Sequence, residues 1–120
     1  MHDKGRALIL VLALLLSAHA LAAPPAEKRG GMLVDPAGMA LYTFDKDGAG
    51  TSNCNERCAV LWPPFVAAAD ARATGEYTLI KRKDGKRQWA LRGMPLYYWL
   101  ADGKPGAATG EAVAGWHLVR

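Results

Sequence analysis

Two stretches of the chain, residues 38–48 and 93–103, read almost alike. Both begin with Gly-Met and continue as Leu-Tyr-x-aromatic-x-x-Asp-Gly, with no gap between the two copies. A shorter echo, Gly-x-x-Leu-Val, occurs at residues 30–34 and again at residues 115–119. Internal similarity of this kind indicates one structural unit that is used twice. We therefore expect the beginning and the end of the domain to be equivalent pieces of one fold.

The first 22 residues have the three-part layout of a secretory signal peptide: basic residues, an apolar run and then small residues. We expect residues 1–22 to be removed on export, residues 23–29 to form a polar lead-in and residues 30–120 to form one domain. The apolar run is shorter than the roughly 20 residues of a membrane span, so we expect the processed chain not to cross a membrane, with an uncleaved anchor as the alternative. Cys54 and Cys58 are the only cysteines, which excludes a lipid-bearing cysteine at the cleavage region.

The pattern predicts an all-β or β-dominated fold, a small single domain of two pseudo-repeated β units. Helical periodicity is scarce, whereas short β-branched and aromatic runs alternate with glycine-rich turns. One short helix, from Cys54 to about Leu61, carries the cysteine pair, with Asn53 as its cap and Glu56 completing a capping box. The strand order stays open between a barrel, a sandwich and a partial propeller. The expected strands span residues 31–34, 39–44, 77–82, 87–91, 95–100 and 115–119.

The cysteine pair is expected to form a disulfide. An exported chain meets an oxidising compartment, and positions i and i+4 of a helical turn bring two Cα atoms to roughly 6 Å, which a disulfide tolerates. One alternative is a copper site that uses Cys54, Cys58 and His117, since thiolates bind soft metals. Another is a catalytic thiol, but the Cys-x-x-Cys spacing of thioredoxin-like chemistry is absent. We expect no cofactor.

The segment after the first tyrosine motif partly fits a calcium loop. Asp45, Asp47, Asn53 and Glu56 occupy positions 1, 3, 9 and 12 of the template. Position 5 is Ala49, which offers no side-chain oxygen, and the preceding element is strand-like. We favour a glycine-rich turn whose aspartates bind the backbone, with calcium as the alternative.

The repeated aromatic residues are expected to form the core. Alternate residues of a strand share a face, so the tyrosine and the next aromatic residue of each motif point together. A small β domain needs such large side chains to bury enough apolar area, although a shallow groove for a sugar, peptide or flat cofactor is the alternative. The aspartates are expected to order the turns, by accepting a tyrosine hydroxyl or backbone amides. The two motifs consist of Tyr42, Phe44 and Asp47, and of Tyr97, Trp99 and Asp102.

The formal net charge is +4, a modest excess that gives no reason to expect a nucleic-acid partner. Five basic residues lie between Lys81 and Arg87, around an Asp-Gly turn, and Arg92 follows. Charge runs are usually solvated, so we favour a hydrated hairpin tip. Contact with an anionic polymer or lipid surface is the alternative.

Taken together, these motifs resemble a family of short secreted repeats in bacterial predicted lipoproteins, which is recognised by Tyr-x-[Phe/Trp/Tyr]-x-x-Asp and described as of unknown function. Companion features also fit, including Ser52-Asn53-Cys54, Trp62-Pro63-Pro64 and Gly115-Trp116-His117. The similarity covers about residues 30–119. The chain departs from the family in lacking a lipid-bearing cysteine. The resemblance implies a periplasmic or secreted bacterial protein and transfers no catalytic residues.

The expected function is that of an exported cell-envelope protein that acts as a non-catalytic binding or interaction module. Its partner would be an unknown envelope component or a small ligand, and the oligomeric state stays open. A Ser-His-Asp enzyme would depend on His117, the single histidine outside the signal segment. The rival function is a periplasmic metal-binding or electron-transfer accessory that uses the cysteine pair to hold copper.

Overall fold

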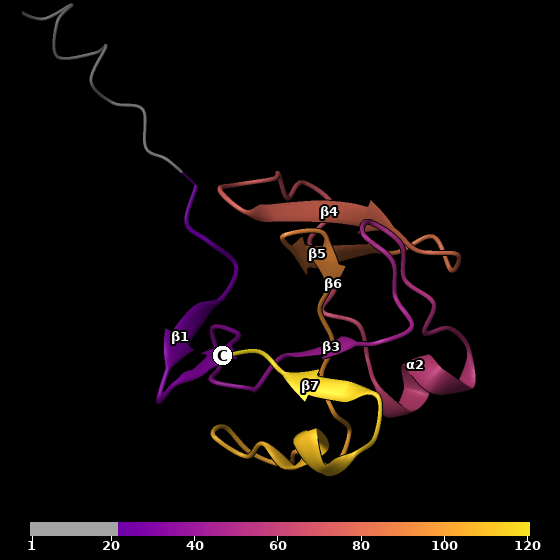
Figure 1. The fold of residues 1–120 in the computed structure, drawn as a ribbon. Helices are drawn as coiled ribbons and strands as arrows, with labels where there is room; N and C mark the ends of the chain where they lie inside the picture. The colour runs from indigo at the N-terminus through magenta and orange to yellow at the C-terminus, as the bar shows by residue number, and fades with distance from the viewer. Residues whose placement is uncertain (1–21) are drawn as a thin grey trace, which may run out of the picture.

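The computed structural model describes residues 22–120, which form a β-dominated domain (Figure 1). The expected signal peptide lies outside these residues, apart from Ala22. All strand pairs are antiparallel and belong to three small sheets. A two-stranded sheet pairs β1 (Glu27–Arg29) with β2 (Met32–Val34), a second pairs β3 (Tyr42–Phe44) with β7 (Trp116–Leu118), and a three-stranded sheet contains β4 (Tyr77–Lys81), β5 (Arg87–Leu91) and β6 (Met94–Pro95).

The two halves of the domain have the same plan. Each begins with a hairpin, β1–β2 in the first half and β4–β5 in the second, and the chain then folds back along the second strand of that hairpin. Leu41 N–H donates to Leu33 C=O at 3.0 Å in the first half, and Leu96 N–H donates to Trp89 C=O at 3.0 Å in the second. The expectation of two pseudo-repeated β units is therefore confirmed.

Each half then sends its last segment across to the other half. Phe65, from the first half, donates its N–H to Leu96 C=O at 2.9 Å, and Val119, from the second, donates to Leu41 C=O at 3.0 Å. At the centre, Tyr42 and Tyr97 exchange two backbone hydrogen bonds of 2.8 and 2.9 Å. A pseudo-two-fold axis passes between these two residues, and the crossing segments join the halves into one domain.

The buried apolar side chains form two clusters. The first lies between the two hairpins, and the second surrounds the two motif tyrosines and contains the tryptophans of the crossing segments. Since both clusters draw on both repeats, neither repeat can bury its apolar face alone. The first cluster contains Ala26, Leu33, Leu41, Phe65, Ala67, Trp89 and Leu96; the second contains Ala40, Tyr42, Cys54, Trp62, Tyr97, Trp116 and Leu118.

The structure corrects several expected boundaries. The strands expected over residues 39–44 and 95–100 are shorter, because the chain changes partner within each: Ala40 pairs with Val34, whereas Tyr42 pairs with Tyr97 and Leu118. β1 was not predicted and lies within the segment expected to be a polar lead-in. Ala26, just before it, is buried in the first cluster. The folded domain therefore begins before residue 30.

The helical segments also differ from expectation. α2 runs over Arg57–Leu61, so it starts three residues later than predicted, and its N-cap is Glu56 with a φ of 53° and no side-chain cap bond. The predicted capping box is wrong, because Asn53 is held elsewhere: its side chain donates to Lys46 C=O at 2.7 Å. A short 3-10 helix, η1 (Thr109–Ala112), was not predicted.

Candidate functional site

The two motif tyrosines each bind the aspartate of the other repeat. The Tyr42 hydroxyl donates to Asp102 Oδ2 at 2.6 Å, and the Tyr97 hydroxyl donates to Asp47 Oδ2 at 2.6 Å. Both tyrosine side chains are fully buried. The motif therefore acts across the pseudo-two-fold axis, and its two copies complete each other.

Asp102 is held by the backbone and side chain of η1. Its Oδ1 atom accepts hydrogen bonds from the N–H and the hydroxyl of Thr109, both at 2.8 Å, while Gly110 N–H donates to the Tyr42 oxygen at 3.1 Å. Glycine is required at position 110, because a Cβ there would lie 2.8 Å from Trp62 and 2.9 Å from the Tyr42 ring. This close approach lets a backbone amide reach the buried hydroxyl.

A series of side-chain hydrogen bonds links Asp47 to Arg82. Ser52 Oγ lies 2.6 Å from the Tyr97 oxygen. Because the single hydroxyl proton of Tyr97 goes to Asp47, Ser52 must donate here, which leaves its oxygen to accept from Arg82 Nη1 at 2.9 Å. The order of donation is therefore Arg82 to Ser52, Ser52 to Tyr97 and Tyr97 to Asp47.

Arg82 is a buried cation that ties the second repeat to the loop of the first. It donates to Gln88 Oε1 and to Cys54 C=O, each at 2.9 Å, and forms an ion pair with Asp84 at 3.0 Å. A buried charge is tolerated only when such partners satisfy it. The basic cluster seen in the sequence thus contains structural residues besides its solvated ones, since Arg87 also donates to the C=O groups of Ala69 and Ala71 at 2.9 and 3.1 Å.

The buried tyrosines are held in their neutral form. Burial, reinforced by the hydrogen-bonded aspartate, raises the pKa of Tyr42 and of Tyr97 far above the ordinary tyrosine value. The pKa of Tyr98 is raised in the same way, by burial and by Asp35, whose Oδ2 accepts its hydroxyl at 2.7 Å. Burial also raises the pKa of the Asp47 carboxyl, although its hydrogen bonds oppose this shift. Neutral tyrosine hydroxyls of this kind fix geometry instead of serving as bases at neutral pH.

Four aromatic rings form a continuous stack across the pseudo-two-fold axis. Trp62 and Trp116 stack at the centre with ring centroids 3.8 Å apart and an interplanar angle of 2°. Phe44 covers Trp116 at 4.2 Å, and Trp99 covers Trp62 at 4.2 Å. The central rings are buried and the two end rings are half-buried. Phe44 and Trp99, the second aromatic residue of each motif, thus cover the two ends of a stack that both halves share.

The remaining candidate residues do not gather at one place. Cys54 and Cys58 form the expected disulfide, with an S–S distance of 2.09 Å. His117 Nε2 lies 2.7 Å from Asp45 Oδ1 on the exposed surface, so its side chain is paired with an aspartate and not with the cysteines. Of the calcium candidates, Asp45 thus faces His117, Asp47 faces Tyr97, and Asn53 and Glu56 lie between that turn and α2. Within residues 22–120, no three histidine, cysteine or acidic side chains are grouped as a metal ion would require.

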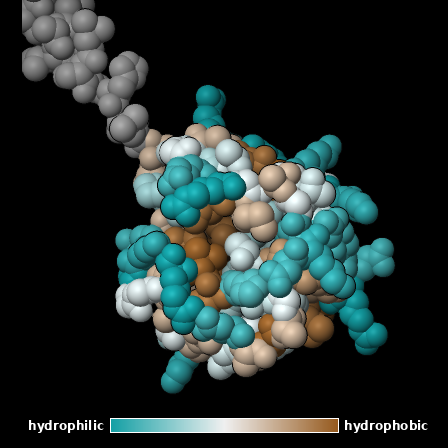
Figure 2. Space-filling view, viewed as in Figure 1, coloured by the Kyte–Doolittle hydropathy of each residue, from teal (hydrophilic) through white to brown (hydrophobic). Residues whose placement is uncertain are grey.

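The two halves differ in sequence where α2 meets the second motif. Leu100 N–H donates to Leu61 C=O at 2.9 Å, and the equivalent bond in the other half runs from Asp45 to Gly115 at 2.9 Å. Leu61 and Leu100, together with Val60, are exposed by 44%, 58% and 64%. We call these three residues the α2 patch; Figure 2 shows hydrophobic surface at the lower right, where Figure 1 places α2. Sequence reasoning missed this patch, although aligning Leu100 with Asp45 would have revealed the difference.

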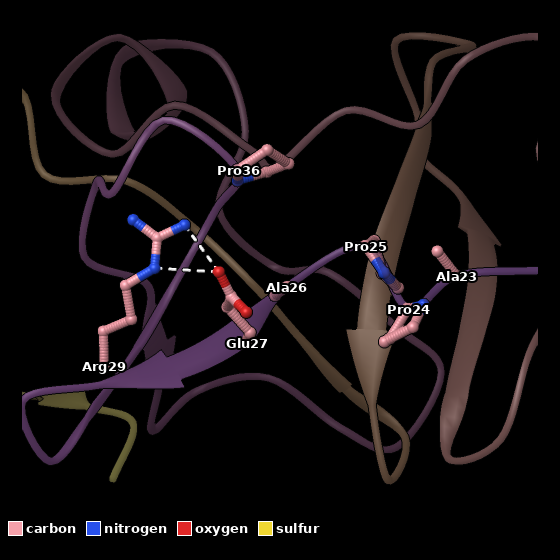
Figure 3. A pocket seen from close by; sticks show the side chains of 7 residues that line it. All are labelled: Ala23, Pro24, Pro25, Ala26, Glu27, Arg29 and Pro36. Carbon is pink, nitrogen blue, oxygen red and sulfur yellow. Dashed lines mark hydrogen bonds and ion pairs between the residues drawn. The ribbon is translucent and has the colours of Figure 1, made fainter.

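A pocket beside β1 has a volume of about 290 Å³ (Figure 3). Its charged side chains are Glu27 and Arg29, and these bind each other (Figure 3). The two charges of the pocket therefore neutralise each other. The rest of its wall consists of Ala23, Pro24, Pro25, Ala26 and Pro36.

Comparison with known families agrees with the two-fold plan. A family described as a secreted repeat of unknown function matches residues 26–66 and again residues 78–120. The two matches coincide with the two structural halves, including β1. No curated protein and no solved structure matches the chain. Among residues 22–120, none of the helices has the length and apolar character needed to cross a lipid bilayer.

Proposed function

Because the chain belongs to the family of secreted repeats of unknown function, we propose that it acts after export as a non-catalytic binding module whose contact surface is the α2 patch. We place the protein in the periplasm or outside a bacterial cell. The repeated interior holds the module together, and the loop that carries α2 makes the contact.

The internal comparison between the halves carries this proposal. The fold accepts Ala114, Gly115 and Asp45 at the positions equivalent to Val60, Leu61 and Leu100. Packing therefore does not require aliphatic side chains there, yet Val60 and Leu61 of the first half and Leu100 of the second are all exposed where the two halves meet. Exposed apolar residues that gather in one place often mark an interaction site.

A binding role also agrees with the state of the reactive groups. The buried tyrosines are neutral, the cysteines are joined in a disulfide, and His117 makes an exposed pair with Asp45. Nucleophilic catalysis needs an activated hydroxyl or thiol beside a base. None of these groups has that arrangement, which favours binding over catalysis.

Site-specific photocrosslinking in the native compartment tests the proposal. The photoreactive residue p-benzoylphenylalanine is placed at position 61 or 100, and at position 45, the repeat equivalent of position 100, as the matched control. We expect covalent adducts from positions 61 and 100 and few from position 45. Equal yields from all three positions, or none from the patch, would overturn the proposal.

A further inference from the structure

The α2 patch lies on the same side of the molecule as the basic hairpin tip. Lys83 and Asp84, from the turn between β4 and β5, line one small hollow with Asn55 and Glu56, just before α2. Figure 1 shows this turn above α2 on the right of the view. The basic turn therefore lies beside the start of α2, the helix that carries Val60 and Leu61.

Four exposed cations accompany the patch. Arg57 precedes Val60 by three residues and Leu61 by four, so it shares their side of the helix. Lys81, Lys83 and Lys86 stand on the hairpin. Within the described chain, none of these four forms an ion pair.

The acidic groups nearby are fewer. Glu56 lies at the start of α2, and Asp84 lies in the hairpin turn, where it pairs with the buried Arg82. Asp84 is thus already balanced by a cation within the protein. The surface around α2 and the hairpin turn presents an excess of positive charge to any partner.

The small size of the α2 patch favours a lipid surface over a protein as its partner. A stable protein interface usually involves about 20 residues on each side. The three aliphatic side chains would make only a small apolar core for an interface of that size. A few apolar side chains flanked by lysine and arginine suit the boundary between lipid headgroups and acyl chains, where cations meet anionic headgroups.

We propose that the α2 patch rests on an anionic lipid surface, with Val60, Leu61 and Leu100 entering the headgroup layer while Arg57 and the hairpin lysines bind lipid phosphates. This inference rests on the proposed function and names its partner. The contact is peripheral and reversible. It should weaken with salt, because screening acts on exposed charges.

Vesicle co-sedimentation of the processed chain tests this inference. The vesicles contain either phosphatidylcholine alone or phosphatidylcholine with phosphatidylglycerol. We expect binding to the anionic vesicles alone and a loss of binding as salt rises. The double variant Leu61→Ser/Leu100→Ser should lower the affinity by at least tenfold, since each leucine, about half exposed in the free protein, loses the apolar transfer energy of its exposed part.

A second variant separates local charge from net charge. Lys83→Glu/Lys86→Glu should lower the affinity by at least tenfold, since each cation near an anionic surface contributes about fivefold. Lys28→Glu/Lys104→Glu makes the same change in net charge away from α2 and the hairpin turn and should bind nearly as well as the parent. All these side chains are exposed, so thermal unfolding should confirm that every variant is folded.

Two outcomes would overturn the lipid partner: no sedimentation that depends on phosphatidylglycerol, or an equal loss in the Lys28/Lys104 control. If vesicles are not bound while position 61 still crosslinks to a protein, the lipid inference fails and the proposed binding function stands. If position 61 gives no adduct and vesicles are not bound, both fail.

Discussion

The two halves of this domain are alike inside and different outside. Inside, each tyrosine binds the opposite aspartate, and each crossing tryptophan stacks on its counterpart. Outside, the loop of the first half carries a disulfide, α2 and exposed aliphatic residues, whereas the loop of the second half carries η1 and ends at Gly115. The repeated motif therefore specifies the contacts between the two halves. The loops after each motif do not take part in those repeated contacts in the same way, and they differ in sequence and structure.

The same tyrosine–aspartate contact is supported in two ways. In the second half, Thr109 and the backbone of Gly110 hold Asp102 and Tyr42. In the first half, Ser52 and the buried Arg82 hold Tyr97, and Arg82 also reaches the backbone of Cys54. The first support depends on local backbone and the second on a long-range network, so the two halves should respond differently to change.

Alkaline pH should have the largest effect, because it acts on both halves at once. The pKa values of Tyr42, Tyr97 and Tyr98 are raised in the folded state, so their contribution to stability is present below about pH 10, the ordinary tyrosine value, and is lost as the pH rises above it. We expect tyrosinate absorbance and loss of near-ultraviolet circular dichroism to coincide in one transition. Two separate transitions would show that the halves unfold independently.

The next largest effect should come from the centre of the stack. Trp62→Ala and Trp116→Ala should each lower the free energy of unfolding by about 3–5 kcal/mol, because both rings are buried against each other. Urea denaturation measures the loss, and the half-buried Trp99→Ala serves as a milder control. A large loss in only one of the two central variants would break the pseudo-symmetry.

Replacing Asp102 and replacing Asp47 should lower the free energy of unfolding by different amounts. Asp102→Ala leaves a fully buried hydroxyl without its acceptor and should cost about 2–3 kcal/mol. Asp47 is only partly buried, so water replaces part of its role and the cost of Asp47→Ala falls to about 1 kcal/mol. The midpoints of urea unfolding give both values. The reverse order would contradict the assigned environments.

The disulfide should have the most localised of these effects, confined to one half of the domain. Closing so short a loop contributes about 2 kcal/mol in the chain-entropy model, and the bond stands in the first half alone. Cys54→Ser/Cys58→Ser should lower hydrogen-exchange protection around α2 and leave η1 unchanged. An equal loss of hydrogen-exchange protection in both loops would contradict the view that the two tyrosine–aspartate contacts are held by separate sets of hydrogen bonds.

The sequence predicts the repeat, the β-dominated fold and the disulfide, because each depends on local spacing. The crossing of the halves is not predictable in the same way: Tyr42 and Asp47 stand in one motif, and nothing in that motif tells that each binds the other copy. The expected strands were too long for a related reason. A run such as residues 39–44 has uniform strand character, but its hydrogen-bond partner changes within it.

The residues of the candidate site also divide into those that local sequence predicts and those that only the assembled fold reveals. The tyrosine and aspartate residues were found from the motif, whereas Arg82 was hidden in a charge run that resembles a solvated turn. Its burial depends on Ser52 and the backbone of Cys54, which come from a distant part of the chain. The α2 patch was missed because exposure is a property of the assembled fold.

A double-mutant cycle on the hydroxyl–carboxylate pairs tests the central claim most directly. Tyr42→Phe is combined with Asp102→Asn and, separately, with Asp47→Asn, and the free energies of unfolding are compared. We predict a coupling of about 1 kcal/mol or more for Tyr42 with Asp102 and additivity, within about 0.5 kcal/mol, for Tyr42 with Asp47. Coupling of Tyr42 to Asp47, the aspartate of its own motif, with none to Asp102, would contradict the exchange between repeats.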